Sequence, residues 1–571
     1  MTTLHRRTVL ATSVAGAGLA ATSTTTLHAA AAPPSSMFQH GVASGDPMAR
    51  RVVLWTRVTP VPAATPGSGV GADTNVRWEV SRDERFRKVV RSGSVVTTAA
   101  RDHTVKIDAT GLAPQTWYFY RFTVGSATSP VGRTRTAPDE ASSPEHLRLG
   151  VVSCANLQAG WFSAYRHLAA RDDLHAILHL GDYIYEYAPG EYGYGRSNVD
   201  IRPHDPAKEM VELADYRRRH AQYKLDPDLQ ALHARYPFIV TWDDHESTND
   251  AWRDGAENHQ PDEGDWHVRR DRSHRAYDEW MPVRMSDTAD LGDGTKLFRR
   301  LTFGTLAEIS MLDLRTYRDQ QVHTTVPSPV PSPDAEVDDP ERTITGREQL
   351  DWLKDSLTAP AQWKLVGNPV MIAPVTFAQV PKDLVGPVND VTGILPRDGA
   401  PYNVDQWDGY TDDRREVFAH IRDRGLRDVV FLTGDIHSGW ACDLPYDAAT
   451  YPVGDSAGVE FVCTSVTSNN LDDITGTPPR TSSLAVEAAI QSNNRHVRYL
   501  NFDDHGYSVF DLTPARAQMD YYAIGDRADR TAPSTLIASW ATRSGTNKVE
   551  PVAQPIPQPI PQPTTVPGPG A

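Results

Sequence analysis

Five short apolar runs in this chain each end at residues that can bind a metal ion or move a proton. The runs are residues 147–152, 176–180, 238–242, 364–367 and 429–432. Each has the length of a buried β-strand, and helical patterns lie between several of them, at 161–171 and 345–357. Alternation of strands and helices predicts a layered α/β domain, and such sheets place ligands at the carboxyl ends of their strands.

The residues at these strand ends are typical metal ligands. They are Cys154, Asp182 with Tyr185, Asp244 with His245, Asn368, and Asp435 with His437. A single Asp after a strand is usually a helix cap, and a single His is usually a packed or surface residue. Five such ends along one sheet edge are not explained by capping alone, and they predict a metal site.

The mixture of donor types indicates two different metal ions. Thiolate, phenolate, carboxylate and imidazole together favour trivalent iron, whereas carboxylate and amide oxygens favour a hard ion such as calcium or manganese. Two ions that share one carboxylate can bind phosphate, lower the pKa of a bound water and stabilise the transition state of phosphoryl transfer. The pattern therefore predicts a binuclear phosphoesterase.

The region before these runs has a different pattern. Residues 52–58, 76–80 and 117–122 are rich in β-branched and aromatic residues, and the last two runs alternate with a period of two. Short runs separated by Gly, Pro and Asp turns predict an antiparallel β-sandwich over residues 37–137. The catalytic α/β domain is predicted to follow at 147–524.

Both ends of the sequence differ from the rest. Arg6-Arg7, a weakly apolar stretch and Ala29–Ala32 are the parts of a signal peptide over residues 1–32, and the paired arginines indicate the twin-arginine route. We therefore expect a secreted, extracellular protein. Gln-Pro-Ile-Pro repeats predict a Pro-rich, disordered tail over residues 545–571.

Composition excludes several classes of protein. Lys and Arg number 57 against 73 Asp and Glu, a formal charge of −16, which argues against a nucleic-acid-binding module. No apolar run is long enough to predict a transmembrane segment, and the absence of heptads favours a monomer. Arg217–Arg219 is interpreted as a solvated helix face.

Three cysteines are too few for a disulfide scaffold. Cys442 and Cys463 could form one bridge outside the cell, or they could lie buried and free. The sequence leaves both alternatives open, because it does not give the distance between the two residues.

Three motifs resemble those of the calcineurin-like metallophosphoesterases, in the versions of the PhoD-type alkaline phosphatases and phosphodiesterases. They are Gly181-Asp182-Tyr183-Ile184-Tyr185, Asp243-Asp244-His245-Glu246 and Gly434-Asp435-Ile436-His437. Residues 38–47 look like the start of that family's N-terminal β domain, and 242–249, 255–259 and 276–282 look like its most distinctive block. The resemblance runs from 37 to 524 in order, and it is close to secreted actinobacterial phospholipase D-like members.

The resemblance implies a fold and a set of residue roles. The fold is α/β: a fibronectin type III-like β-sandwich, then a metallophosphoesterase sandwich of two mixed sheets flanked by helices. The implied roles are Cys154, Tyr185 and His437 on Fe³⁺, Asp182 bridging both ions, Asp244, Asn368 and Asp435 on Ca²⁺, His245 as general acid or transition-state stabiliser, and Asn156 as a phosphate contact or ligand. Mn²⁺ or Zn²⁺ is an alternative second ion.

The implied function is a secreted hydrolase of phosphomonoesters and phosphodiesters, with a metal-bound hydroxide as the nucleophile. One alternative is phospholipase D-type hydrolysis of phospholipid head groups at the same site, and a wall teichoic-type polymer is a further possible partner. An alternative of another class is an inactive protein that binds phosphate or wall polymer. That alternative requires lost ligands, whereas every expected position here holds a competent residue.

Overall fold

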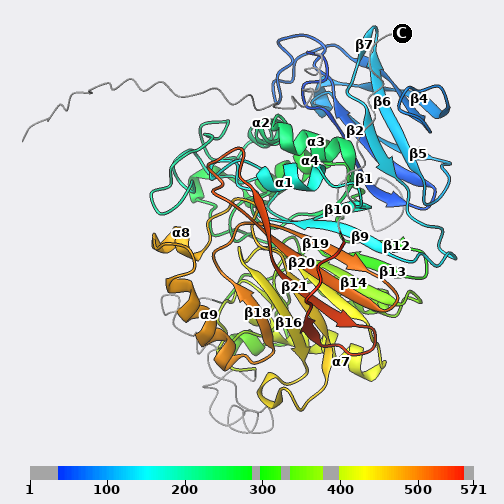
Figure 1. Cartoon of the computed structure of the whole chain (residues 1–571). Coiled ribbons are helices and arrows are strands. Elements are labelled where there is room, and N and C mark those ends of the chain that lie inside the picture. Colours follow the sequence, from blue (N-terminus) through cyan, green and yellow to red (C-terminus); the bar gives the residue numbers. More distant parts are fainter. Residues whose placement is uncertain (1–35, 286–295, 323–334, 377–397, 558–571) are drawn as a thin grey trace, which may run out of the picture. The chain divides into compact units, whose positions relative to one another are not determined.

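The structure is a computed structural model that describes residues 36–285, 296–322, 335–376 and 398–557 (Figure 1). These residues belong to one compact unit that begins at Pro34. The predicted signal peptide, residues 1–32, and residues 558–571 of the predicted tail lie outside the described residues.

Ten strands form the first sheet. They are β1 Val42–Met48, β2 Arg51–Arg57, β5 Thr104–Thr110, β9 Leu147–Val152, β10 Ala176–Leu180, β11 Pro237–Thr241, β19 Gly506–Leu512, β20 Arg516–Ile524, β21 Ser534–Arg543 and β22 Val549–Pro551. Their order across the sheet is β22-β21-β20-β19-β9-β10-β11-β1-β2-β5. The central strands β9, β10, β11 and β1 are parallel, so the carboxyl ends of β9, β10 and β11 meet at one edge.

Seven strands form the second sheet. They are β12 Arg299–Phe303, β13 Ala307–Met311, β14 Trp363–Asn368, β15 Val429–Thr433, β16 Gly439–Pro445, β17 Ser456–Val462 and β18 Val497–Asn501. Their order is β12-β13-β14-β15-β17-β16-β18, with β13, β14, β15 and β17 parallel to one another. Both large sheets are therefore mixed.

Helices cover the outer faces of the two sheets (Figure 1). They are α1 Ser163–Ala169, α2 Leu213–Tyr223, α3 Pro227–Arg235, α4 Trp266–Trp280, α5 Arg347–Leu357, α7 Thr411–Asp423, α8 Leu471–Thr475 and α9 Ser482–Asn493. Helices α1–α4 pack on the ten-stranded sheet, and α5, α7 and α9 pack on the seven-stranded one. The result is the α/β sandwich of two mixed sheets that the sequence predicts.

Burial of both sheet faces explains why the strands read as continuous apolar runs. In β10, Ile177 faces the helix-covered core, whereas Leu178 and Leu180 face the core between the two sheets. In β15, Phe431 faces the helix-covered core, whereas Leu432 faces the core between the two sheets. Successive side chains point to opposite faces of a strand, so both faces are mostly apolar, and a polar residue such as His179 is hydrogen-bonded, here to Tyr165.

The N-terminal β-sandwich shares a sheet with the catalytic region. One layer is the sheet of β3 Thr74–Ser81, β4 Val89–Thr97, β6 Trp117–Val124, β7 Ala127–Thr128 and β8 Gly132–Arg135. The other layer is β1, β2 and β5, which pack against it through one apolar core and also continue the ten-stranded sheet. These N-terminal strands are blue to cyan in Figure 1.

The C-terminal tail is ordered further than its composition predicts. The prediction of disorder from residue 545 is wrong for the described part, because β22 pairs with β21 and the side chain of Ile556 is buried. Two apolar side chains, Val549 and Ile556, reach separate cores and anchor a segment that otherwise consists largely of Gln and Pro.

The burial of side chains decides two further predictions, one on Arg217–Arg219 and one on the cysteines. The solvated face predicted for Arg217–Arg219 is wrong for two of its members: Arg217 pairs with buried Glu279 at 2.7 Å, and Arg219 donates to the backbone carbonyl of Tyr185. Cys442 and Cys463 are buried and free, as is Cys154, so the second of the two cysteine alternatives is confirmed.

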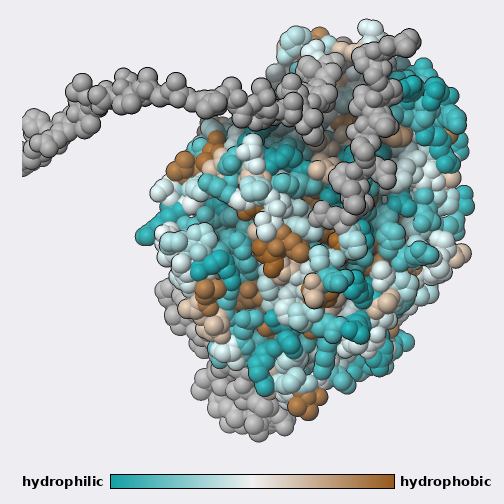
Figure 2. All heavy atoms as spheres, in the orientation of Figure 1, coloured by the Kyte–Doolittle hydropathy of each residue, from teal (hydrophilic) through white to brown (hydrophobic). Residues whose placement is uncertain are grey.

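No helix in the described part of the chain is both long enough and apolar enough to cross a membrane. The face shown in Figure 2 is mostly hydrophilic, and its hydrophobic residues gather in small separate groups.

A buried lysine that pairs with no carboxylate among the described residues lies beneath the motif Gly181–Tyr185. Lys224 is 2% exposed, and its Nζ donates to the hydroxyl of Tyr183 at 2.9 Å and lies 3.2 Å from His233 Nε2. The ammonium also lies 4.9 Å from the ring centroid of Trp55. Burial lowers the pKa of Lys224 to about 7.

This burial predicts a pH-dependent stability. An unfolded lysine has a pKa of about 10.4, so between pH 7 and that value the unfolded chain binds a proton that the folded chain lacks, and stability rises with pH. From about pH 7 to pH 9, Lys224 should add about 2 kcal/mol to the free energy of unfolding, a rise that Lys224→Met should lack. Urea denaturation at both pH values measures it.

The exposed Lys88 provides the control, since Lys88→Met should keep the rise of the unmodified chain. Equal slopes in the unmodified chain and Lys224→Met would show that the lysine is charged in the folded state.

Candidate metal centre

The two large sheets meet at the carboxyl ends of their parallel strands. Gly434, just after β15, packs so closely on the first sheet that an added Cβ would lie 2.8 Å from Ser153 Cβ and 2.9 Å from the carbonyl oxygen of Leu180. Only glycine permits this approach. Residues that follow β9, β10 and β15 are thereby brought to one place.

Four predicted ligands adopt a left-handed backbone. The φ angles are +57° at Cys154, +55° at Asp182, +65° at Asp435 and +49° at His437. This region is uncommon for residues other than glycine and costs free energy, and such residues cluster at functional sites. The chain turns sharply at each of these strand ends.

The first group of ligand atoms combines three strand ends. Atoms of Cys154, Asp182 and His437 lie within 4.8 Å of one another. The hydroxyl of Tyr185 donates to Asp182 Oδ2 at 2.8 Å and lies 3.5 Å from His437 Nε2. The four side chains predicted to hold the first ion are therefore adjacent.

The imidazole of His437 is oriented for ligation. Its Nδ1 lies 2.9 Å from the carbonyl oxygen of Asn469, which can only accept, so Nδ1 carries the proton and Nε2 keeps a lone pair. Burial lowers the pKa of His437 to about 4, which keeps the ring neutral. Ser468 Oγ donates to the Tyr185 hydroxyl at 2.6 Å and holds it in place.

The second group shares one member with the first. Atoms of Asp182, Asp244 and His245 lie within 4.8 Å of one another. Asp244 Oδ1 accepts from the backbone N–H of His245 at 2.9 Å, and Oδ2 accepts from that of Asp250 at 2.6 Å. Asp182 thus lies where one carboxylate can serve both groups.

His245 is held by a buried glutamate that sequence reasoning missed. Its Nδ1 lies 2.8 Å from Glu186 Oε2, while Glu186 Oε1 accepts from Asn249 N–H at 2.8 Å and from Asn258 Nδ2 at 3.0 Å. Burial alone would raise the pKa of Glu186, but His245 and these donors lower it to about 2. The sequence signal that could have identified Glu186 was its position directly after Tyr185 in the motif.

Opposing effects act on the imidazole of His245. Burial favours the neutral ring, but the carboxylates of Asp244, Glu186 and Asp182 outweigh it and hold its pKa well above the usual value. The ring stacks on Tyr185 with centroids 4.1 Å apart. The rings of Tyr187 and Tyr192 lie 5.5 and 6.3 Å from it.

Three further predicted site residues make other contacts. Asn368 accepts from Trp407 Nε1 at 3.2 Å and donates to the carbonyl oxygen of Val370 at 2.5 Å. Asn156 donates to the carbonyl oxygen of Tyr192 at 2.6 Å, and its Oδ1 accepts from Gln158 N–H at 3.0 Å.

The third of these residues is Asp435, whose carboxylate joins neither group. Its backbone carbonyl lies 3.6 Å from Cys154 Sγ. Burial raises the pKa of Asp435, and the charges of Asp243 and Asp405 raise it further.

A buried arginine, also missed from the sequence, holds the acidic side of the centre. Arg315 makes two-pronged contacts with Asp243, at 2.6 and 3.0 Å, and with Asp405, at 2.9 Å for both prongs. It also lies 3.8 Å from Asp244. The segment that carries Arg315 directly follows β13, but Glu308 and Ser310 interrupt the apolar residues of that strand, so no apolar run marked it in the sequence.

The residues present fit metal ions. Asp182 Oδ1 is buried and makes no hydrogen bond to any residue that the structure describes. Burial and neighbouring acidic groups raise the pKa of Asp182 and Cys154 well above their usual ranges, and the positive charge of His245 offsets only part of this effect at Asp182. A cation bound among thiolate, phenolate, carboxylate and imidazole would supply that charge, and this donor set suits a transition metal.

Comparison with known proteins agrees with this geometry. The sequence model of the PhoD-like phosphatases matches residues 149–521, and that of the PhoD-like phosphatase N-terminal domain matches residues 21–138. Alkaline phosphatase D of Bacillus subtilis (strain 168) is 38% identical over 485 residues, which are 85% of this chain and 77% of that protein.

A solved structure described as "Structure of PhoD" has 34% identity and a TM-score of 0.79, over 92% of this chain and 94% of that one. The family resemblance predicted from the motifs is thereby confirmed. The chain belongs to the PhoD-like phosphatases and is a phosphoric ester hydrolase.

Proposed function

We propose that this enzyme hydrolyses phosphomonoesters and phosphodiesters at a binuclear metal centre. The observation that carries the proposal is the convergence of Cys154, Asp182 and His437, with Tyr185 hydrogen-bonded to Asp182. These donors come from three separate strand ends, and a purely structural role does not require such different chemical types at one point. Because the expected positions are filled in a member of a phosphatase family, the inactive binding protein is not retained.

Each ion would be held by residues of both sheets. Cys154, Tyr185 and His437 would hold Fe³⁺, and Asp182 would be shared between the ions. Asp244 would hold a second ion, Ca²⁺ or alternatively Mn²⁺ or Zn²⁺, with support from Asp435 and the remaining lone pair of Asn368 Oδ1. When bound, such ions supply positive charge for the phosphoryl oxygens and lower the pKa of water.

His245 would act on the leaving oxygen. Its Nδ1 is committed to Glu186, so Nε2 is the atom that can donate a proton to that oxygen or a hydrogen bond to the phosphoryl group. Glu186 is a positioning residue, since it touches the imidazole rather than the substrate. Stacking on Tyr185 restricts the ring further.

Arg315 would keep the second ion's ligands in place. It cross-links Asp243, which precedes Asp244, to Asp405 in a distant loop. Its charge offsets part of the repulsion among the buried carboxylates, and its fork geometry fixes their orientation. Asn156 would hold the loop of Tyr192 beside His245, and it could also contact a phosphate through its second amide hydrogen.

Phospholipid head groups are a second candidate substrate class. Two exposed apolar side chains favour it: Val199 is 52% exposed and Ile474 is 58% exposed, and the segments that carry them approach each other where Gly476 meets Arg196. Asn469 connects the same loop to His437 through its side chain and carbonyl. A wall teichoic-type polymer would use the same diester chemistry.

The proposed enzyme is exported and monomeric. Arg6-Arg7 and the alanine-rich stretch that follows support export by the twin-arginine route, which carries folded proteins and so allows a metal acquired before export. No sequence repeat suggests self-association.

The metal assignment predicts a specific loss. Cys154→Ser should bind much less iron than the unmodified protein, which should carry about one iron per chain, because a hydroxyl is a far weaker donor than a thiolate. Elemental analysis of the purified protein measures this without reference to activity.

Cys442→Ser makes the same chemical change at an equally buried site remote from the ligand groups, so it should keep its iron. Equal iron in the two variants would remove Cys154 from the ligand set.

The role of His245 predicts a dependence on the leaving group. His245→Asn should lower kcat by about 100- to 10,000-fold for alkyl phosphates, whose leaving oxygens need a proton. The loss should be much smaller for p-nitrophenyl phosphate and bis-p-nitrophenyl phosphate, whose leaving group departs as an anion. Steady-state kinetics across such a series of substrates measures these changes in kcat. Release of choline from phosphatidylcholine vesicles tests the phospholipid substrate class in the same variants.

His267→Asn, at an exposed position on α4, should leave every rate unchanged. A loss of the same size for all leaving groups would contradict proton donation by His245 and assign it to phosphate binding.

A further inference from the structure

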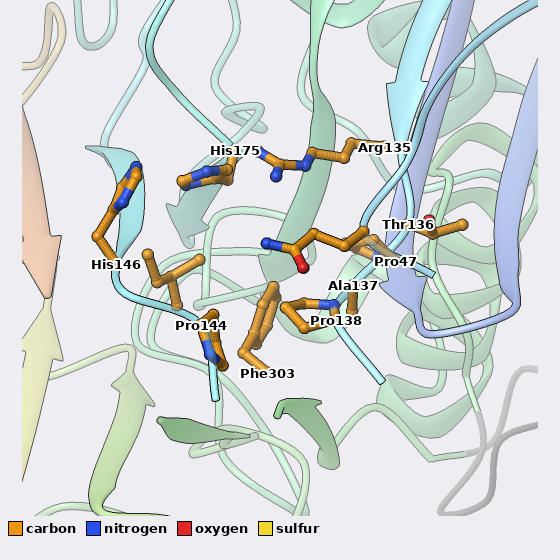
Figure 3. Close-up of a pocket in the computed structure, with 11 residues that line it drawn as sticks. Pro47, Arg135, Thr136, Ala137, Pro138, Pro144, His146, His175 and Phe303 are labelled. Carbon is orange, nitrogen blue, oxygen red and sulfur yellow. The ribbon is translucent and has the colours of Figure 1, made fainter. Parts of the chain in front are cut away.

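A small pocket with a few polar side chains lies at the seam between the N-terminal strands and the catalytic region. Gln115 and Arg135 come from the N-terminal strands and turns, whereas His146 and His175 immediately precede β9 and β10. Figure 3 shows the guanidinium of Arg135 directed at His175, with Phe303 and several prolines forming an apolar floor.

Two polar side chains of this pocket have unused hydrogen-bond donors, although the guanidinium of Arg135 also lies 5.4 Å from the ring centroid of Trp117. Neither the guanidinium of Arg135 nor the side-chain amide of Gln115 has a hydrogen-bond or ion-pair partner among the described residues. No Asp or Glu is among the described residues that line the pocket. The neighbouring Asp173 is committed to Arg148 and Arg171, at 2.7 and 2.6 Å.

The tautomer of His175 adds a donor. Its Nδ1 accepts from the backbone N–H of Arg148 at 2.8 Å, so the proton of the neutral ring lies on Nε2. The ring of His146 lies 5.0 Å away, between centroids. Burial lowers the pKa of His175 to about 3, and the positive charge of Arg135 contributes to the shift. The pocket therefore combines one positive charge, on Arg135, with a neutral N–H donor, on His175.

The pocket is small and distant from the metal centre. Its volume is about 20 Å³, little more than the roughly 10–15 Å³ that one water needs, and Gln115 and His146 are exposed, so it admits one oxygen of an anion whose remainder stays at the surface. It lies at the amino ends of β9 and β10, whereas the metal ligands follow their carboxyl ends. At about 3.3 Å per residue, six-residue β9 separates the two sites by roughly 20 Å.

We propose that this pocket is an oxyanion site, in which Arg135, His175 and Gln115 bind a phosphate or carboxylate group. A guanidinium offers several parallel N–H donors and suits such an anion. Because these residues come from both sides of the seam, the bound anion joins the N-terminal strands to the catalytic region. The site is independent of the hydrolytic chemistry.

Equilibrium dialysis with radiolabelled inorganic phosphate tests the proposal on the full metal-loaded protein. The unmodified protein should bind one phosphate per chain more than Arg135→Gln, or bind it at least about tenfold more tightly. Any phosphate at the metal centre is common to both proteins, so the difference reports this pocket.

Gln115→Gly is the second variant, because Gln115 has a φ of +50°, at which glycine is unstrained. It should weaken the same phosphate. Arg85→Gln removes one exposed positive charge from the connection between β3 and β4, outside the pocket, and it should bind phosphate like the unmodified protein.

Competition with acetate distinguishes the two sources of the anion. Displacement of only the Arg135-dependent phosphate would assign the site to carboxylates, and failure to displace it would assign the site to phosphates. Equal binding by the unmodified protein, Arg135→Gln and Gln115→Gly would overturn the proposal. An equal loss of phosphate binding in Arg85→Gln would also overturn it, because the loss would then reflect the overall positive charge rather than this pocket.

Discussion

Two buried glutamates hold the loops on which the metal centre depends. Glu246 accepts the backbone N–H groups of Tyr183 at 2.5 Å, Asp243 at 2.8 Å and Asp182 at 3.2 Å. It thereby ties the loop after β10 to the loop after β11. Without it, the buried N–H groups at these strand ends would lack partners at considerable cost in free energy.

Glu460 does the same in the second sheet, where it accepts from the N–H groups of Ile372 and Ala373 at 3.0 and 2.8 Å and from Thr433 Oγ1 at 2.6 Å. Each sheet thus carries one carboxylate that sets the position of its ligand loops. Close contact at Gly434 then joins the two sets. A left-handed backbone at four proposed ligands is tolerated because this surrounding network over-determines it.

Short sequence patterns predicted the positions of strands, which depend mainly on residues that are close together in the chain. The predicted strands 147–152 and 176–180 coincide with β9 and β10, since an apolar run bounded by turn residues and buried on both faces has few alternatives. The expectation that all five strand ends share one sheet edge is wrong, because β14 and β15 belong to the second sheet. Cys154, Asp182 and Tyr185 follow neighbouring strands of the first sheet, and His437 joins them only because the two sheets meet closely at Gly434. The observed end of a strand differs by one residue from the prediction where a polar residue continues the hydrogen-bonded pairing, as Thr433 does in β15.

Long-range pairings were not predictable in this way. Nothing in the sequence of β1, β2 and β5 indicates that they extend the catalytic sheet, because that depends on pairing with β11 far along the chain. Arg315 meets Asp243 and Asp405 across equally distant segments. The burial of Arg217 and Arg219, and the anchoring of the tail by Ile556, depend on tertiary contacts that composition does not report.

The central claim is that one ion has a sulfur ligand from Cys154 together with oxygen and nitrogen ligands from Asp182, Tyr185 and His437. X-ray absorption at the iron edge of the purified protein tests it most directly, because sulfur and oxygen or nitrogen neighbours scatter differently. The account predicts a single sulfur neighbour in a shell otherwise made of oxygen and nitrogen. An iron shell of oxygen and nitrogen alone, or zinc in place of iron, would contradict it.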